Sequence, residues 1–208
     1  MFDCASLLIF ISVTAFLVAT PGPNTFYIIT RSIQGGYHAG IASCAGRLLA
    51  TLVHIAAAAS GLSLIVLSSP SLFNFIKYAG AGYLIWIGAK TIVSKSKSET
   101  MAENGDAKYG SIIRHGFLVN LLNPKTALFF LAFLPQFVNP SIGGVTHQFV
   151  LLGSILAVVG TTSDSIYVLL AGTVGKWLRN NLTFFRSLRY VAGSVYLSLG
   201  VAAAFGIK

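Results

Sequence analysis

Charged residues are scarce in this chain, and acidic residues are the scarcest of all. Only 9% of its 208 residues are charged, with 5 acidic side chains against 14 basic ones. Soluble domains carry about 25% charged residues, so this scarcity excludes an ordinary soluble protein. With 55% hydrophobic residues and a mean hydropathy of +0.78, the composition is that of an integral membrane protein.

Cysteine is also nearly absent, since the chain has only Cys4 and Cys44. Two cysteines are too few for a disulfide framework. The topology derived below places Cys4 at the outer end of one span and Cys44 near the inner end of the next, too far apart to form a bridge. This separation argues against an intramembrane thiol–disulfide conductor, and both residues are interpreted as small apolar packing residues.

The net charge of +9 does not indicate nucleic-acid binding. The basic residues lie mostly in short segments between apolar runs, which is the positive-inside pattern of membrane proteins. Only Lys77 and Lys208 fall on one side of the predicted spans. Ten basic residues fall on the other side: Arg31, Lys90, Lys95, Lys97, Lys108, Arg114, Lys176, Arg179, Arg186 and Arg189. The asymmetry predicts a cytoplasmic linker and both termini outside.

Six apolar segments are each long enough to cross a bilayer as a helix. The first is interpreted as an uncleaved span, because it lacks a basic N-terminal region and a small-residue cleavage site. Residues 94–113 are polar without apolar periodicity and are interpreted as a cytoplasmic linker. The predicted spans are 5–29, 39–67, 72–93, 116–137, 148–174 and 190–207. The sequence therefore predicts an all-α integral membrane protein, with three spans in residues 1–93 and three in 114–208.

The segment from Asn123 to Thr126 (Asn-Pro-Lys-Thr) interrupts the fourth predicted span. Pro124 removes a backbone donor and breaks or kinks a helix. Lys125 follows it at bilayer depth, where a cation is costly unless it faces the protein interior or water. We interpret the pair as an anion site near the membrane midplane, made of free N–H groups and one ammonium group. The alternative is a simple kink with Lys125 extending to an interface.

The two halves of the chain carry related patterns. The segment from Gly22 to Thr25 (Gly-Pro-Asn-Thr) resembles that from Asn123 to Thr126. A three-span unit that is duplicated must be inverted, because three is odd. Inverted repeats with helix breaks at corresponding places are typical of secondary transporters, and the breaks point to the substrate site. We therefore expect six transmembrane helices as two inverted three-helix repeats.

Four ionisable residues lie inside the predicted spans: Arg47, His54, Lys125 and Asp164. Asp164 suits a proton carrier or an ammonium ligand, and its alternative is a structural ion pair with Arg47 or Lys125. His54 suits a proton relay, or else bonds to a helix carbonyl as a neutral side chain. His54 and Asp164 fall at similar depth if spans two and five are equivalent. Three roles are open for Arg47: it contacts the substrate, it pairs with Asp164, or it extends to the cytoplasmic interface.

With these features in place, the sequence resembles the lysine exporter (LysE/RhtB) family of amino-acid efflux proteins. The segments that carry the resemblance are 20–24, 40–46 with His54 after it, 78–88, 116–126, 133–137 and Asp164. The resemblance covers nearly the whole chain. It implies six spans, a bacterial inner membrane, and export of amino acids or close derivatives. Arg47 departs from the family, in which a neutral residue is expected, and an added cation favours an acidic or a larger substrate.

We therefore predict a secondary transporter that exports a small zwitterion, and not an enzyme. The substrate carboxylate is expected at Lys125 and at N–H groups freed by Pro124, and its ammonium group at Asp164 or at unwound carbonyls. Proton antiport is assigned to Asp164, with His54 as a relay. The predicted substrate-binding residues are Pro23, Asn24, Asn123, Pro124, Lys125 and Asp164.

The expected partners are an amino-acid-like substrate, protons and the lipid bilayer, with no nucleic acid. A homo-oligomer is compatible with the sequence. No cofactor and no metal ion is expected. The alternative function is a passive channel for small zwitterions, which the lone intramembrane carboxylate and the paired helix breaks disfavour.

Overall fold

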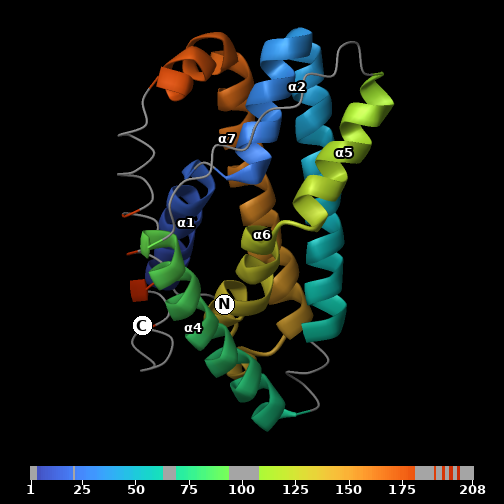
Figure 1. Ribbon diagram of the computed structural model, residues 1–208. Coiled ribbons are helices and arrows are strands. Elements are labelled where there is room, and N and C mark those ends of the chain that lie inside the picture. Colours follow the sequence, from blue (N-terminus) through green and yellow to red (C-terminus); the bar gives the residue numbers. More distant parts are fainter. Residues whose placement is uncertain are drawn as a thin grey trace.

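The chain forms helices and no strands wherever its structure is described, as predicted for an all-α protein. The computed structural model describes residues 4–20, 22–62, 69–93, 108–180, 190, 194, 197–198 and 201. The elements are α1 (Cys4–Ala19), α2 (Pro23–Ala57), η1 (Ala58–Leu62), α4 (Pro70–Val93), α5 (Tyr109–Leu121), α6 (Pro124–Leu128), η2 (Phe129–Phe133), η3 (Leu134–Phe137), η4 (Pro140–Ile142) and α7 (Val145–Asn180). Figure 1 shows α2 and α7 running along the length of the molecule, α5 beside α2 in the upper half, and α4 lying obliquely across the lower end.

The first helix break separates α1 from α2, where the sequence predicted one. α1 ends at Ala19, and Gly22 has an extended backbone with φ −147° and ψ −171°. Pro23 lies in the first turn of α2, a position that suits its fixed φ and its missing N–H. The predicted span 5–29 is therefore two helices, and backbone groups at both facing ends lack helical partners.

α2 reverses direction at Gly36, inside the gap between the first two predicted spans. Gly36 has φ 72° and ψ −169°, a conformation that residues with a Cβ rarely adopt. Ile28 and Cys44 share one buried cluster, although a straight helix would hold their Cα atoms about 24 Å apart. Figure 1 shows the two arms of α2 side by side. The arms before and after Gly36 thus behave as separate helices, as the two predicted spans require.

The second helix break divides the predicted span 116–137. α5 ends at Leu121, α6 begins at Pro124, and the helices on the two sides of the break are bent by 50°. The Asn123 side chain caps α6 by accepting a hydrogen bond from the backbone N–H of Lys125 at 3.0 Å. α5 begins at Tyr109, so its first turn occupies residues that the sequence assigned to the end of the 94–113 linker.

Two glycines allow α2 and α5 to pack closely. A Cβ added at Gly46 would collide with the backbone of Ile113, and one added at Gly116 would lie 2.9 Å from the carbonyl oxygen of Ser43. Small residues of this kind let helix backbones touch in membrane proteins. The second arm of α2 and α5 therefore pack with their backbones in contact.

Aromatic rings hold α1 against η2 and η3. The ring of Phe10 is fully buried. Its centroid lies 5.7 Å from that of Phe133 and 5.1 Å from that of Phe137. Leu152 and Leu156 of α7 complete the same buried cluster. The core therefore lies between α1, the chain after the second break, and α7.

By length and composition, two described helical stretches are apolar enough to cross a membrane, namely Pro23–Leu62, which includes the reversal at Gly36, and Val145–Ala171. The bent pair Tyr109–Leu121 and Lys125–Phe137 is a third if it counts as one span. Large apolar side chains on these helices, such as Val158 and Leu169, are exposed, as expected of surfaces that face lipid tails. The sixth predicted span, 190–207, lies almost entirely outside the described residues. The complete set of six spans and their inverted repeat therefore stay predictions.

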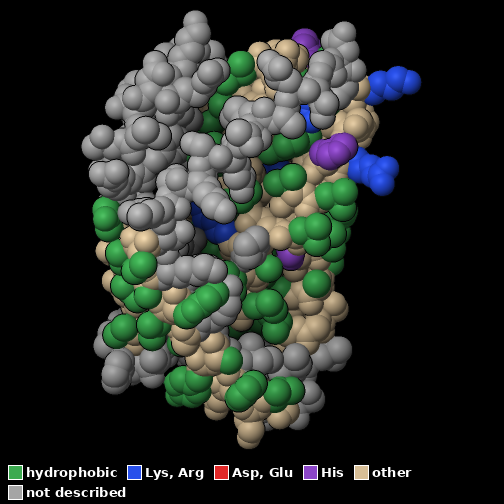
Figure 2. Space-filling view, viewed as in Figure 1, with side chains coloured by type: hydrophobic (Ala, Val, Ile, Leu, Met, Phe, Trp, Pro, Cys, Tyr) green, Lys and Arg blue, Asp and Glu red, His purple; other side chains and the backbone are tan. Residues whose placement is uncertain are grey.

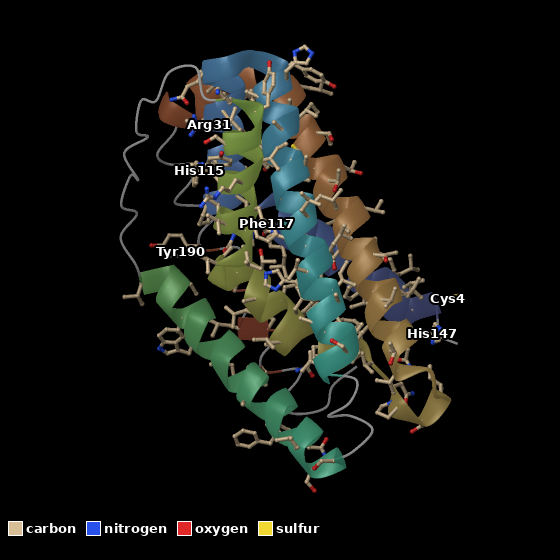
Figure 3. All side chains as sticks on the ribbon, turned by 90° about the vertical axis from the view of Figure 1, so that its right-hand side faces the viewer. Cys4, Arg31, His115, Phe117, His147 and Tyr190 are labelled. Carbon is tan, nitrogen blue, oxygen red and sulfur yellow. The ribbon has the colours of Figure 1, made fainter. Side chains whose placement is uncertain are left out.

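Basic side chains gather toward one end of the described structure. Figure 3 places Arg31 and His115 toward the end where α2 reverses, and Cys4 and His147 nearer the other end. In Figure 2, blue basic side chains project beside α5, while green hydrophobic side chains are spread over the rest of the described face.

Cys4 is exposed and Cys44 is buried, and both are free thiols, as the sequence predicted.

Candidate functional site

A pocket lies between the two helix breaks. Charged, polar and apolar side chains from around the two breaks line it. The breaks contribute the polar backbone and side chains, and α7 and the second arm of α2 close the other sides. Its lining residues are Leu17, Val18, Gly22, Asn24, Thr25, Arg47, Thr51, Asn123, Lys125, Thr126, Leu128, Phe129, Phe133, Leu156 and Asp164.

Asn120 connects the walls of this pocket from behind. Its side chain is fully buried, and its Nδ2 donates to the carbonyl oxygen of Arg47 at 2.8 Å and to the hydroxyl of Thr51 at 2.9 Å. Its Oδ1 accepts from Nδ2 of Asn24 at 2.6 Å and from the hydroxyl of Thr126 at 2.8 Å. One amide thus joins both arms of α2 to α6. The sequence analysis missed Asn120, although an amide inside an apolar run, close before a break, was a usable signal.

Lys125 contacts the end of the other broken helix. Its Nζ donates to the carbonyl oxygens of Leu17 at 2.6 Å and Thr20 at 2.7 Å. A cation is favourable at a helix C-terminus, where the dipole is negative. The hydroxyl of Tyr167 donates to the neighbouring carbonyl of Ala19 at 2.8 Å. Lys125 therefore stabilises the end of α1, which accounts for a cation placed beside the start of α6.

The starts of α6 and α2 differ in how many donors they offer. At α6 the Asn123 side chain occupies the N–H of Lys125, and Pro124 has none. The backbone donors predicted for a carboxylate at this break are thus largely used within the break itself. At α2 the cap residue is Gly22, which makes no side-chain cap. The first N–H groups of α2 after Pro23 therefore offer more donors to a ligand.

Arg47 and Asp164 form a buried ion pair. Nη1 of Arg47 lies 2.9 Å from Oδ2 of Asp164, and the two residues are 8% and 4% exposed. The guanidinium group fills the space beside Gly160, where an added Cβ would collide with it. Arg47 therefore does not extend to an interface, and the pairing that the sequence analysis left open is the one observed.

His54 lies away from the pocket. Its ring stacks on Phe130 at a centroid distance of 5.3 Å, and its buried Nε2 has no hydrogen-bond partner among the described residues. Gly153 faces Ile55, whereas Gly160 faces Arg47. Residue numbers thus rise along α7 as they fall along the second arm of α2, so these two helices pack antiparallel. His54 is then about 15 Å along the helix axis from the level of Asp164. The expectation that these two residues share one depth is wrong, because the register places Arg47 beside Asp164.

Most of the predicted site residues do come together. Asn24, Asn123, Lys125 and Asp164 all line the pocket, with Arg47 beside them. Pro23 and Pro124 start the two helices at the breaks, and Pro23 is not among the lining residues. Within the described part of the chain, no group of three or more His, Cys, Asp or Glu side chains gathers that could hold a metal ion.

Comparisons with known proteins identify several relatives of this chain. The family model described as LysE type translocator matches residues 15–206. An uncharacterized membrane protein of Bacillus subtilis (strain 168), YrhP, is 30% identical over 205 residues, covering 94% of this chain and 97% of that protein. A leucine efflux protein of Enterobacter sp. (strain 638) is 29% identical over 165 residues, covering 79% and 78%. One from Salmonella typhimurium is 29% identical over 158 residues, covering 74% and 73%. No solved structure is significantly similar to this chain.

Proposed function

Because the chain belongs to the LysE type translocator family, we propose that it is a secondary transporter that exports a small amino acid across the bacterial inner membrane. One observation carries the proposal: a pocket with both signs of charge lies where two broken helices meet. Broken helices that face one another at a central site are the usual construction of secondary transporters. A protein that only scaffolds a membrane has no need of such a pocket.

The lining of the pocket suits an amino acid with an aliphatic side chain. Its charged groups are Arg47, Lys125 and Asp164. The remaining wall includes a set of apolar side chains, namely Leu17, Val18, Leu128, Phe129, Phe133 and Leu156. A zwitterion with a branched apolar side chain matches this division between charged and apolar walls. The leucine efflux proteins among the relatives support the same substrate class.

The charged groups of the substrate have natural partners in the pocket. Its carboxylate faces the cationic wall formed by Lys125, Arg47 and the start of α2, where backbone donors are available. Its ammonium group faces Asp164, the only carboxylate among the described residues that line the pocket. Asn24 and Asn123 border the two breaks and shape the space between them. These contacts replace the hydrogen bonds to water that the charged groups of the substrate lose on entering the pocket.

We also assign to Asp164 the coupling of substrate export to inward proton movement. An intramembrane carboxylate that alternates between the two sides can carry a proton inward while substrate leaves. His54 keeps its predicted role as a relay, and its distance from Asp164 requires bridging water. Both chain termini are then outside and the basic end with Arg31 is cytoplasmic, in agreement with the positive-inside count.

Transport by purified protein in proteoliposomes tests the proposal. Vesicles loaded with labelled leucine should lose it faster when protons are driven in the opposite direction. Leucine outside should also accelerate release, because a carrier shows exchange and a passive pore does not. Release without such acceleration favours the channel alternative. Vesicles that release leucine no faster than protein-free vesicles contradict the proposed function.

A further inference from the structure

Arg47 and Asp164 belong to the wall of the pocket and not only to the packing around it. Both residues line the pocket, and both are more than nine-tenths buried. The contact between them joins one nitrogen of the guanidinium group to one oxygen of the carboxylate. Because Gly160 has no side chain, the guanidinium group can lie flat against α7 beside the pocket.

A structural role alone is a weak explanation for this pair. Buried ion pairs are often no more stabilising than apolar residues of the same volume. α2 and α7 are already joined by apolar contacts, among them Ile28 with Val168 and Ile55 with Gly153. A guanidinium group carries five N–H donors in a planar fork, and a carboxylate has two acceptor oxygens. The pair therefore retains bonding capacity beyond its own single contact.

The other cation of the pocket is more fully occupied. Lys125 uses two of its three ammonium donors on the carbonyl oxygens of Leu17 and Thr20. By contrast, the N–H groups at the start of α2 have no side-chain cap. Beside them, Oδ1 of Asn24 is buried with no hydrogen-bond partner among the described residues. Unused polar capacity is thus concentrated at Arg47, Asp164 and the start of α2.

We propose that the Arg47–Asp164 pair is the receptor for the two charged groups of a free α-amino acid, an inference that rests on the proposed function. Arg47, with the first N–H groups of α2, binds the carboxylate, and Asp164 binds the ammonium group. One ion pair then becomes a closed set of four charges. The substrate adds one charge of each sign, so the net charge of the pocket is unchanged and neither buried side chain loses a partner.

This arrangement makes Arg47 a specificity-determining residue. A compound that lacks the carboxylate, such as leucinamide, brings a third cation toward Arg47 and Lys125. A compound that lacks the ammonium group, such as N-acetyl-leucine, brings a second anion toward Asp164. Each loses one of the two charge-assisted contacts that leucine makes, and that loss is costly in a site of low dielectric constant. The pocket should therefore accept free amino acids and reject both derivatives.

The experiment measures binding of leucine, leucinamide and N-acetyl-leucine to purified protein in detergent. The readout is the rise in Tm as the concentration of each compound increases. Wild-type protein should bind leucine at least about tenfold more tightly than either derivative, as the loss of one charge-assisted hydrogen bond predicts. Arg47→Gln should lose most of the preference for leucine over leucinamide. Arg114→Gln, which removes an exposed arginine outside the pocket, should leave it intact.

A second variant guards against loss of folding. Arg47→Gln combined with Asp164→Asn removes both charges together and leaves neither one buried alone, so it should fold and lose most of the preference for leucine over the two derivatives. If Arg47→Gln or the double variant keeps the wild-type preference for leucine, the zwitterion receptor is wrong while the transporter assignment stands. If wild-type protein neither binds nor transports leucine, the proposed function itself fails.

Discussion

The side-chain amides of Asn24 and Asn120 meet across the two helix breaks, with Nδ2 of Asn24 donating to Oδ1 of Asn120 at 2.6 Å. Asn24 lies in the first turn of α2, just after the first break, and Asn120 lies in the last turn of α5, just before the second. This single hydrogen bond connects residues that are 96 positions apart in the chain. The two breaks therefore form one site, and changes at either of them should affect the same substrate.

Replacing Asn120 with leucine should destabilise the whole site. The substitution removes both ends of an amide that makes four hydrogen bonds and leaves Thr51, Thr126 and Asn24 with unmet polar groups. Each unsatisfied buried group costs about 1–3 kcal/mol, so Tm should fall clearly. Asn74→Leu, at an exposed position of α4, is the matched control and should change Tm little. Equal Tm values for the two variants would contradict the central position of Asn120.

Lys125→Met separates the ammonium group from the alkyl stem. Because Nζ bonds to the end of α1, we expect a lower Tm, by an amount equivalent to about 1–3 kcal/mol, together with weaker leucine export. Lys125→Arg should also be impaired, since a planar fork does not replace a compact ammonium group at a fitted site. Lys108→Met, at an exposed position, provides the control. If Lys125→Met keeps normal stability and normal transport, both roles of Lys125 are wrong.

Asp164→Asn should uncouple transport from protons. The amide keeps the shape of the side chain but cannot carry a proton, so efflux driven by a pH gradient should fall sharply. Because the change leaves Arg47 without its anionic partner, protein abundance and Tm must be measured beside transport. The comparison with Arg47→Gln and Asp164→Asn combined removes that complication. Unchanged gradient-driven efflux in Asp164→Asn would exclude Asp164 as the coupling group.

Gly160→Ala tests whether the position of Arg47 matters. A Cβ at residue 160 would collide with the guanidinium group and displace it from Asp164, and overpacking of this kind costs about 1–3 kcal/mol. Both Tm and leucine affinity should fall. Gly82→Ala on α4 meets no atom within 4 Å and should be neutral or slightly stabilising. Wild-type affinity in Gly160→Ala would show that the site tolerates a moved Arg47.

The orientation in the membrane can be tested with accessible tags. Tags at both chain termini should be labelled from outside intact cells, whereas a tag at Glu103 should be labelled only after the cells are opened. The expectation follows from the ten basic residues on the predicted inner side, because cytoplasmic loops carry an excess of lysine and arginine. A C-terminus that is reached only from the cytoplasm would overturn both the orientation and the odd number of spans per repeat.

Local covalent rules allowed the sequence to determine where the helices break. Pro23 and Pro124 lack a backbone donor and fix φ, so each begins a helix and cannot continue the preceding one, and both do so in the structure. Composition alone likewise set the protein class, because a chain with 9% charged residues cannot cover a water-facing surface. The sequence also drew attention to Arg47, Lys125 and Asp164, since an ionisable side chain at bilayer depth is costly.

Only the tertiary structure decided which of these groups meet. The register between α2 and α7 places Arg47, and not His54, beside Asp164, and no local pattern specifies a register between helices far apart in sequence. Lys125 proved to stabilise the end of α1, and Asn120 proved to join three helical segments. These contacts depend on side chains from distant segments converging after the helices have packed. Hydrophobic periodicity and proline positions carry no information about that convergence.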